Sequence, residues 1–504
     1  MKAFSLLLAL WAASLSSLAA PQASVDETID PGKSYWNEHV HYPYPVQSAK
    51  LRDRHGSDWE LAYLDVFHGD AAARAKAPVL VLLHGRGMNS GYWGTLLEAP
   101  LAAGWRVVSI DWGHWGKSLP RNMKVPINRS LDDVRELVHQ LVVKQLGIAQ
   151  ADYLGHSLGG QLAAGYALKY PANVRRLVLY APGGMESVPA TTIQFLKLDD
   201  PALQTDEARF LALWKGGKLP ALASTTEEEQ KAFYQIHPGK LPYGKIDDPL
   251  SRFSANSRAR ALNGNPQEAE RYRQIYSWYS IAALLESRQE DDNSLPARLS
   301  RIQAPTLLLL GLQDPAFPIP GTGNTQIVAD MVHPFYLMAR SRKMPLQIKL
   351  YKNAGHFIHT DLPEDMSRDV VSFLKQGEVA GPLYAGNPEA YLPPARTALA
   401  TLPAPVSEFK AAWEKTLLKQ ALAGVRELLH PEIKHTGRNL EQVVGFFQSF
   451  IGHVTRWEVV VFGAELVDGE WVLDVETRND FGVHPDRFFL KQHEGQWRLF
   501  GNRL

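Results

Sequence analysis

Six short apolar runs constrain the fold of this chain more than any other feature of its sequence. Each run is rich in Val, Ile and Leu and is long enough for one strand. The runs cover residues 77–85, 105–112, 151–157, 174–182, 304–314 and 346–356. Short apolar runs of this kind are typical of strands buried on both faces of a parallel sheet.

Helical patterns separate most of these runs. They cover residues 92–103, 131–146, 158–170 and 366–374, and Ser130 is the expected N-cap of the second. Alternating strands and helices with right-handed crossovers predict an α/β fold, a doubly wound and mostly parallel sheet with helices on both sides. Two alternating stretches around residues 55–58 predict an antiparallel hairpin that opens this domain.

The interval 183–300 departs from this rhythm. It has no convincing strand pattern but carries amphipathic segments at 208–217, 227–237 and 270–287. We therefore expect a helical insertion that folds over the C-terminal edge of the sheet as a lid.

A second, smaller domain is expected after the first. Residues 377–406 are rich in Gly, Pro and Ala, a composition typical of linkers. In 407–504 we expect a helix that Ser407 caps and that runs to Leu429, and another from Leu440 to Ile451. Four strand patterns follow, with turns at Asp468-Gly469 and Glu494-Gly495. The order predicts an α+β domain whose sheet is an antiparallel meander.

The N-terminus resembles a secretory signal peptide. Lys2 precedes the apolar stretch 3–13, and Ser17-Leu18-Ala19 offers a small-x-small cleavage site. The apolar stretch is shorter than the ~20 residues that cross a bilayer. We expect residues 1–19 to be a signal peptide and residues 20–376 to form the first domain. The mature protein is then exported, periplasmic or secreted, without a stable membrane anchor.

Composition excludes several kinds of chemistry. The 504 residues include 53 basic and 53 acidic side chains, so the net charge is zero and no excess of basic residues indicates nucleic-acid binding. A small neutral or apolar substrate fits this balance better. The absence of cysteine excludes disulfides, thiolate metal sites and a cysteine nucleophile. We expect no cofactor and no metal, since the spacing of His356, His359 and Asp361 lies on a loop without a further ligand set.

Polar residues stand at the ends of the apolar runs, where an open parallel sheet binds its ligands beyond the carboxyl ends of the strands. They are His84, Asp111, Ser157, Asp314 and His356. A serine, an acid and a histidine thus occur in that chain order. Ser157 lies between two glycines, in Gly155-His156-Ser157-Leu158-Gly159, where a strand pattern ends and a helix pattern begins.

This pentapeptide and its context resemble the nucleophile elbow of the α/β-hydrolase superfamily, and the resemblance extends over residues 45–376. It implies that Ser157 is a nucleophile, that His356 is its base and that Asp314 orients the histidine. It also implies an oxyanion hole made by the backbone N–H groups of Arg86 and Leu158.

Some assignments have rivals. His359 competes with His356 as the base, and Asp111 competes with Asp314 as the acid, although the family carries a structural aspartate at the position of Asp111. His114 stands where the family's loop after the second parallel strand has a glycine. The Arg86 side chain either reaches a carboxylate or phosphate of the substrate, or is solvated or salt-bridged.

The leading functional hypothesis is an exported serine hydrolase that cleaves a small-molecule carboxylic ester through an acyl-serine intermediate. A serine at the elbow excludes dehalogenases and epoxide hydrolases that place an aspartate there. Amide, carbon–carbon bond or acyl-transfer chemistry with the same triad remains open, as does a non-catalytic binding protein. The second domain is similar to the nuclear-transport-factor-2-like fold, which implies a homodimer through it or a ligand-holding role without catalysis.

Overall fold

The computed structural model describes residues 37, 41–118, 130–195, 198–204, 206–215, 266–289, 291–319, 322, 324–392, 396–418, 422–434, 439–450, 454–480 and 482–501. The expected signal peptide 1–19 and the lid segment 227–237 lie outside these residues.

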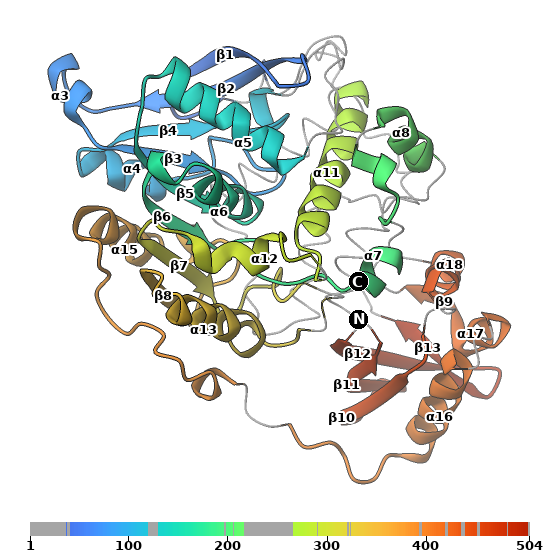
Figure 1. The fold of residues 1–504 in the computed structure, drawn as a ribbon. Coiled ribbons are helices and arrows are strands. Elements are labelled where there is room, and N and C mark those ends of the chain that lie inside the picture. The colour runs from blue at the N-terminus through green and yellow to red at the C-terminus, as the bar shows by residue number, and fades with distance from the viewer. Residues whose placement is uncertain are drawn as a thin grey trace.

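The first unit is built on an eight-stranded sheet in the order β1-β2-β4-β3-β5-β6-β7-β8 (Figure 1). The strands are β1 Val46–Arg52, β2 Asp58–Val66, β3 Val79–Leu83, β4 Arg106–Ile110, β5 Ala151–His156, β6 Val174–Tyr180, β7 Thr306–Gly311 and β8 Leu346–Tyr351. β1 and β2 form the antiparallel hairpin, β2 is also antiparallel to β4, and the strands from β4 to β8 are parallel. All six apolar runs are therefore strands, and the predicted α/β fold class is confirmed.

The predicted helices are α4 Thr95–Ala102, α5 Leu131–His139 and α6 Leu158–Lys169, which lie between strands, and α15 Pro363–Gln376, which follows the last strand of this sheet. Ser130 caps α5, because its side chain accepts the Asp133 N–H while the Asp133 side chain accepts the Ser130 N–H. α5 packs against α6 and α4 packs against α15 (Figure 1). α6 is buried from Leu158 to Ala167, since its Gly and Ala residues let it lie closely against β5 and β6.

Shorter elements complete the first unit. They are α3 Ala71–Lys76, η3 Gly116–Ser118, η4 Gln140–Gln145, η5 Pro171–Asn173, α12 Leu295–Arg298, η7 Leu299–Arg301, η8 Ile327–Val332, α13 His333–Ser341, α14 Ile358–Asp361 and η9 Glu389–Tyr391.

The insertion between β6 and β7 is helical where it is described. It contains α7 Ala190–Phe195, η6 Pro201–Gln204, α8 Glu207–Lys215 and the long helix α11 Pro266–Glu286. α11 lies over the C-terminal ends of β3 and β4 (Figure 1), because its Tyr272 hydroxyl donates to the Gly87 carbonyl at 2.8 Å and Tyr279 packs edge-on against Trp112.

The second unit is a five-stranded sheet in the order β10-β11-β12-β13-β9 with three helices. Its elements are α16 Ala404–Leu418, α17 Leu422–Leu428, β9 Leu429–Lys434, α18 Leu440–Phe450, β10 Trp457–Val467, β11 Glu470–Asn479, β12 Gly482–His493 and β13 Gln496–Gly501. The strands from β10 to β13 form the expected meander, and Asp468, Gly469, Glu494 and Gly495 all have positive φ in its turns.

Two expectations for this unit are wrong. Ser407 is not an N-cap, because its N–H donates to the Pro403 carbonyl and so lies inside the first turn of α16. Leu429 does not end a helix but begins β9, which pairs in parallel with β13, so the sheet is mixed rather than a pure meander. β9 contains Pro431, and an edge strand is where a sheet tolerates proline.

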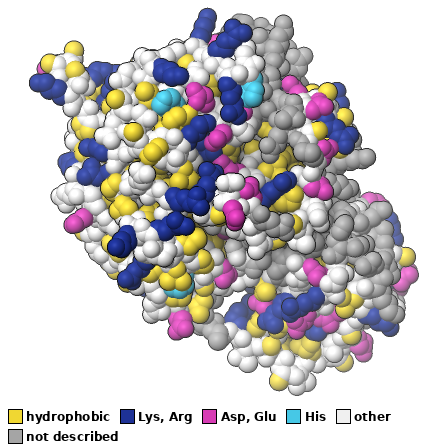
Figure 2. All heavy atoms as spheres, in the orientation of Figure 1, with side chains coloured by type: hydrophobic (Ala, Val, Ile, Leu, Met, Phe, Trp, Pro, Cys, Tyr) yellow, Lys and Arg dark blue, Asp and Glu magenta, His cyan; other side chains and the backbone are white. Residues whose placement is uncertain are grey.

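The predicted linker 377–406 is joined to the second unit at its C-terminal end. The Leu399 N–H donates to the Val461 carbonyl at 2.9 Å, and residues 404–406 belong to α16. Over the visible face of both units, basic and acidic side chains occur together (Figure 2). Within the described residues, every helix is too short or too polar to cross a membrane.

Candidate active site

Ser157 occupies the corner between β5 and α6 with a backbone that L-residues rarely adopt. Its φ is 55° and its ψ is −122°, a conformation that costs about 1–3 kcal/mol and needs support from its surroundings. The Ser157 N–H donates to the Tyr180 carbonyl at 2.9 Å, and the Ser157 carbonyl accepts the Gly183 N–H at 2.9 Å. The turn is thus held from the end of β6.

The two glycines of the pentapeptide are required by close backbone approach. A Cβ at Gly155 would lie 2.2 Å from the Gly159 carbonyl oxygen, and one at Gly159 would lie 2.1 Å from the Leu83 carbonyl oxygen. Any side chain would therefore separate the strand, the helix and β3. Close approach of the backbone therefore accounts for both glycines of the motif around Ser157.

Asp314 and His356 lie in contact. Asp314 follows β7 and His356 follows β8, and the distance from His356 Nδ1 to Asp314 Oδ2 is 2.8 Å. The other carboxylate oxygen of Asp314 accepts the Ala316 N–H at 2.7 Å. Because a carboxylate only accepts, Nδ1 of His356 carries the proton, which leaves Nε2 as the basic nitrogen of the ring. Both side chains are buried, at 1% and 5% exposure.

The loop that carries His356 contacts the turn at Ser157 through His156, the residue before Ser157. The His156 ring centroid lies 4.7 Å from that of His356, and His156 Nε2 lies 3.0 Å from the His356 carbonyl oxygen. The three predicted residues Ser157, Asp314 and His356 are therefore brought to one place on the sheet, past the ends of β5, β7 and β8.

The predicted oxyanion donors flank the serine. A Cβ at Gly85 would lie 3.2 Å from the Ser157 Cβ, so the loop that carries Arg86 passes beside the nucleophile. Leu158 opens α6, and the first N–H groups of a helix have no acceptor within it. Both backbone N–H groups thus belong to segments next to Ser157.

Buried Tyr92 and His156 join three loops of this site, a connection that the motif does not reveal. Burial holds the pKa of His156 well below its usual range, so its ring is neutral. Its Nε2 donates to the His356 carbonyl, and Nδ1 therefore accepts the Tyr92 hydroxyl at 2.7 Å. The same hydroxyl accepts the Gly85 N–H at 3.3 Å.

His359 occupies a structural position. Its Nε2 donates to the Tyr92 carbonyl at 3.2 Å and its Nδ1 accepts the Tyr180 hydroxyl at 2.9 Å. Burial lowers its pKa to about 4. Both ring nitrogens are occupied and neither faces a carboxylate, so the geometry favours His356 as the base.

Asp111 is likewise engaged away from the histidine. Its carboxylate accepts the Ser90 N–H at 2.6 Å, the Lys117 N–H at 2.8 Å and the Tyr42 hydroxyl at 2.7 Å. Burial raises its pKa. Asp111 thus ties two loops together, and Asp314 remains the candidate acid.

The departure at His114 is accommodated by packing. The His114 ring stacks on Trp59 with centroids 4.2 Å apart and is 1% exposed. Gly116, two residues later, has a φ of 51°, and a Cβ there would lie 2.4 Å from Asp111 Oδ2. The glycine at this position, rather than His114, lets the loop close on the aspartate.

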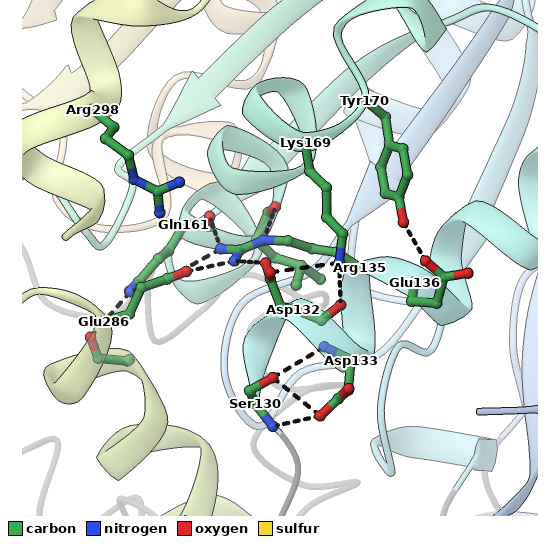
Figure 3. Close-up of polar contacts among 12 residues, drawn as sticks. Ser130, Asp132, Asp133, Arg135, Glu136, Gln161, Lys169, Tyr170, Glu286 and Arg298 are labelled. Carbon is green, nitrogen blue, oxygen red and sulfur yellow. Dashed lines mark hydrogen bonds and ion pairs between the residues drawn. The ribbon is translucent and has the colours of Figure 1, made fainter. Parts of the chain in front are cut away.

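A buried ion pair joins α11 to α5, and a hydrogen bond to the same carboxylate joins α11 to α6, the helix that follows Ser157 (Figure 3). Arg135 of α5 is 1% exposed and donates to both carboxylate oxygens of Glu286, at the end of α11. Gln161 of α6 donates to the same carboxylate at 2.9 Å. A Cβ at Gly165 would lie 2.0 Å from the Arg135 guanidinium carbon, so the bare glycine makes room for the cation.

The described residues contain no group of three or more His, Asp or Glu side chains arranged to hold a metal ion. His359 and Asp361 lie in the short helix α14 and not on a loop as expected, and the Asp361 carboxylate accepts the Gly355 N–H at 2.8 Å.

Comparisons with known proteins agree with the fold and the site described above. A sequence profile of the alpha/beta hydrolase fold matches residues 78–360, more than half of the chain. The 1-acylglycerol-3-phosphate O-acyltransferase of Arabidopsis thaliana is 25% identical over 343 residues, which are 65% of this chain and 73% of that protein. The 2-hydroxy-6-oxononadienedioate/2-hydroxy-6-oxononatrienedioate hydrolase 2 of Pseudomonas putida is 25% identical over 335 residues, 65% of this chain and 96% of the relative.

Solved structures give weaker likenesses. A probable hydrolytic enzyme from Pseudomonas aeruginosa PAO1 has a TM-score of 0.49 at 24% identity, covering 68% of this chain and 97% of that one. A carboxylesterase from Bacillus subtilis has a TM-score of 0.38 at 21% identity, covering 67% and 94%. The match over residues 78–360 shows that this chain belongs to the alpha/beta hydrolase fold family, and membership supports hydrolase activity.

Proposed function

We propose that this protein is an exported serine hydrolase that cleaves carboxylic esters. The observation that carries the proposal is the buried pair of Asp314 and His356, joined at 2.8 Å, at the same end of the sheet as Ser157 in its strained turn. A serine needs a base to become a nucleophile, and the base needs a third group to orient it. An ester suits this machinery because its alcohol leaves without special assistance.

The reaction proceeds in two halves. His356 Nε2 takes the proton of the Ser157 hydroxyl as its oxygen attacks the ester carbonyl carbon, and Asp314 stabilises the imidazolium that forms. The N–H groups of Arg86 and Leu158 stabilise the oxyanion. His356 then gives its proton to the leaving alcohol, and an acyl-serine remains. Water, deprotonated by His356, attacks this acyl group; the bond to the Ser157 oxygen breaks, His356 returns the proton to that oxygen, and the carboxylic acid is released.

The first experiment is hydrolysis of p-nitrophenyl esters with two to sixteen acyl carbons by the purified protein. We expect activity that peaks at one chain length and that Ser157→Ala lowers by at least ~10³-fold. Ser372→Ala, at a half-buried serine of α15, is the matched control and should keep full activity. Equal activity of Ser157→Ala and the control would rule out Ser157 as the nucleophile.

Hydrolysis of a carbon–carbon bond beside a ketone is a second candidate. The relative from Pseudomonas putida is named for 2-hydroxy-6-oxononadienedioate, an oxo-diacid that contains no ester. Ser157, with His356 as its base, would attack the ketone carbonyl carbon; the carbon–carbon bond then breaks, His356 gives its proton to the leaving carbon, and an acyl-serine remains for hydrolysis. Consumption of that compound by this protein, with no ester hydrolysed, would favour this candidate over the esterase.

Export and self-association complete the proposal. Export rests on the signal-peptide pattern of residues 1–19, and N-terminal sequencing of the protein from fractionated cells tests it. A homodimer through the second unit rests on the resemblance of residues 407–504 to a fold that dimerises. The mass of the full-length protein in solution tests that expectation.

A further inference from the structure

The backbone of Arg86 runs beside the nucleophile. Arg86 lies in the loop after β3, directly after Gly85, whose hypothetical Cβ would lie 3.2 Å from that of Ser157. On its other side, the Gly87 carbonyl accepts the Tyr272 hydroxyl of α11 at 2.8 Å. The cation therefore projects from the backbone that passes between the serine and the lid helix.

The lid helix orients the guanidinium group without neutralising it. Arg86 Nη1 donates to the Ser280 hydroxyl at 2.6 Å, and the guanidinium carbon lies 4.6 Å from the centre of the Tyr276 ring. Ser280 gives its own proton to the Tyr276 carbonyl, at 2.7 Å. A guanidinium carries five N–H donors. Its contacts in the described part of the chain thus leave most of these donors available.

The buried and half-buried arginines of the first unit fall into two groups: some make an ion pair, and others, namely Arg86, Arg176, Arg288 and Arg298, make none with the described residues. Of the second group, Arg86 is the one in the loop beside Ser157. Arg106, Arg135, Arg175 and Arg271 each donate to a carboxylate, on Asp65, Glu286, Asp152 and Glu207. Arg86 is half-buried and makes no ion pair with any residue that the structure describes. Withdrawing a charge from water without an opposite charge is unfavourable, so a negatively charged ligand would stabilise this arrangement.

We propose that Arg86 binds a negatively charged oxygen group, a carboxylate or a phosphate, on the part of the substrate that does not react. The protein then prefers esters whose acyl chain ends in an anion. This inference rests on the proposed ester hydrolysis and names its substrate class. The proposed anionic substrate differs from the neutral substrate that we expected from the zero net charge. The net charge of the whole chain does not describe the electrostatic field at one loop.

The guanidinium geometry gives the proposal two measurable consequences. A planar guanidinium binds a carboxylate or phosphate through two parallel hydrogen bonds, which a lysine cannot reproduce. A fixed cation also attracts anionic substrates from solution, and salt screens this attraction. Preference for a charged ester should therefore depend on arginine itself and should decrease with ionic strength.

The test compares three p-nitrophenyl esters of similar length: the neutral pentanoate, the monoglutarate and the 4-phosphonobutanoate. We expect kcat/KM of the wild type for at least one charged ester to exceed that for the pentanoate about tenfold or more, and the more strongly preferred ester identifies the anion. Arg86→Gln should reduce this ratio at least tenfold, and Arg86→Lys should restore only part of it. Arg176→Gln is the matched control, because it removes another half-buried arginine that makes no ion pair, one that donates to the Leu374 carbonyl at 3.0 Å, so the ratio should persist. A ratio that Arg86→Gln leaves unchanged would overturn the proposal and leave Arg86 as a lid contact only.

Binding separates this proposal from the proposed function. Glutarate and inorganic phosphate are titrated calorimetrically into Ser157→Ala and into Ser157→Ala/Arg86→Gln. If no ester is hydrolysed but binding of one anion is lost with Arg86, the esterase proposal fails and the anion site stands. If esters are hydrolysed without charge preference and neither anion binds, the anion site fails alone.

Discussion

One hydroxyl group, that of Tyr92, fixes the relative position of three loops around the nucleophile. It donates to His156 and accepts the Gly85 N–H, while the Tyr92 carbonyl accepts His359 Nε2. His156 in turn holds the His356 backbone. Without the hydroxyl, a buried N–H and a buried ring nitrogen would lose their partners together.

We predict that Tyr92→Phe lowers kcat for ester hydrolysis about tenfold and changes KM by less than about twofold, because a displaced base and oxyanion loop weaken the transition state more than substrate binding. Steady-state kinetics with p-nitrophenyl esters measure both constants. Tyr351→Phe is the matched control, since it removes a buried tyrosine hydroxyl that donates to Asp369 at 2.7 Å, away from the loops of Ser157 and His356. Equal losses of kcat in the two variants would contradict a positioning role for Tyr92.

The residues proposed for catalysis were accessible from the sequence, since each ends an apolar run and the pentapeptide around Ser157 marks the turn. Tyr92, Tyr180 and the structural role of His359 were not. Their roles depend on hydrogen bonds between distant segments, such as Tyr180 with His359, and no local pattern encodes such a contact. The absence of an ion pair at Arg86 also required the three-dimensional arrangement.

At the scale of elements, the lid is attached where α11 ends. Arg135, Glu286 and Gln161 bring α5, α11 and α6 together in the network of Figure 3. Removing one partner of a buried ion pair leaves the other charge buried without an opposite charge, whereas replacing both partners with apolar groups leaves no buried charge.

We predict that Arg135→Met lowers the free energy of unfolding by about 3–5 kcal/mol and that adding Glu286→Leu recovers part of the loss. Chemical denaturation of the three proteins measures the values. Arg273→Met, which breaks a half-exposed pair with Glu270 within α11, should cost less than about 1 kcal/mol. A double variant less stable than Arg135→Met would contradict the explanation by an unpaired buried charge.

Glu186 joins the loops after β6 and β7. Its buried carboxylate accepts the Ile319 N–H at 2.8 Å, the Thr322 hydroxyl at 3.0 Å and the Asn324 amide at 3.0 Å. Burial raises its pKa from 4.5 to about 7. Because the folded pKa is the higher one, the contribution of Glu186 to stability is complete below pH ~4.5 and is lost as the pH rises through about 7.

We predict that the melting temperature of the wild type, relative to Glu186→Gln, decreases between pH 5 and pH 8, since only the wild type must either take up a proton or bury a charged carboxylate on folding. Thermal unfolding of both proteins across this range measures the difference. Glu364→Gln, at an exposed position of α15, is the control and should follow the wild type at every pH. Parallel curves for wild type and Glu186→Gln would exclude this effect.

Elements of the first unit were predictable because burial on both faces gives parallel strands an apolar run that is visible in the sequence. β9 was not, because it is a short edge strand with a proline and it pairs with a distant strand. The predicted start of α16 at Ser407 was wrong. The helix begins at Ala404, and the Pro403 carbonyl accepts the Ser407 N–H.

At the scale of the whole molecule, the chain carries two units with separate sheets, and every residue of the candidate site belongs to the first. The core of the second unit is centred on Trp413, which is fully buried and contacts Phe409, Phe447 and Phe488. The second unit should therefore affect the stability of the chain without taking part in the reaction.

We predict that Trp413→Ala destabilises the second unit by about 3–5 kcal/mol, while the initial rate of ester hydrolysis at 25 °C stays within about twofold of the wild type. Calorimetry and initial rates test the two parts. Leu154→Ala, in the core of β5, is the comparison and should reduce stability and activity together. A large loss of activity in Trp413→Ala would show that the second unit supports the reaction.

The pairing of β9 with β13 also sets the order in which this chain can mature during translation. Leu429 meets Leu499 across a parallel pair, so β9, α17 and α18 leave the ribosome well before their partner strand exists. The eight strands of the first sheet have by then all been synthesised. The first unit can fold while the strands of the second unit are still unpaired. Aggregation through these unpaired strand edges is the main risk during that interval.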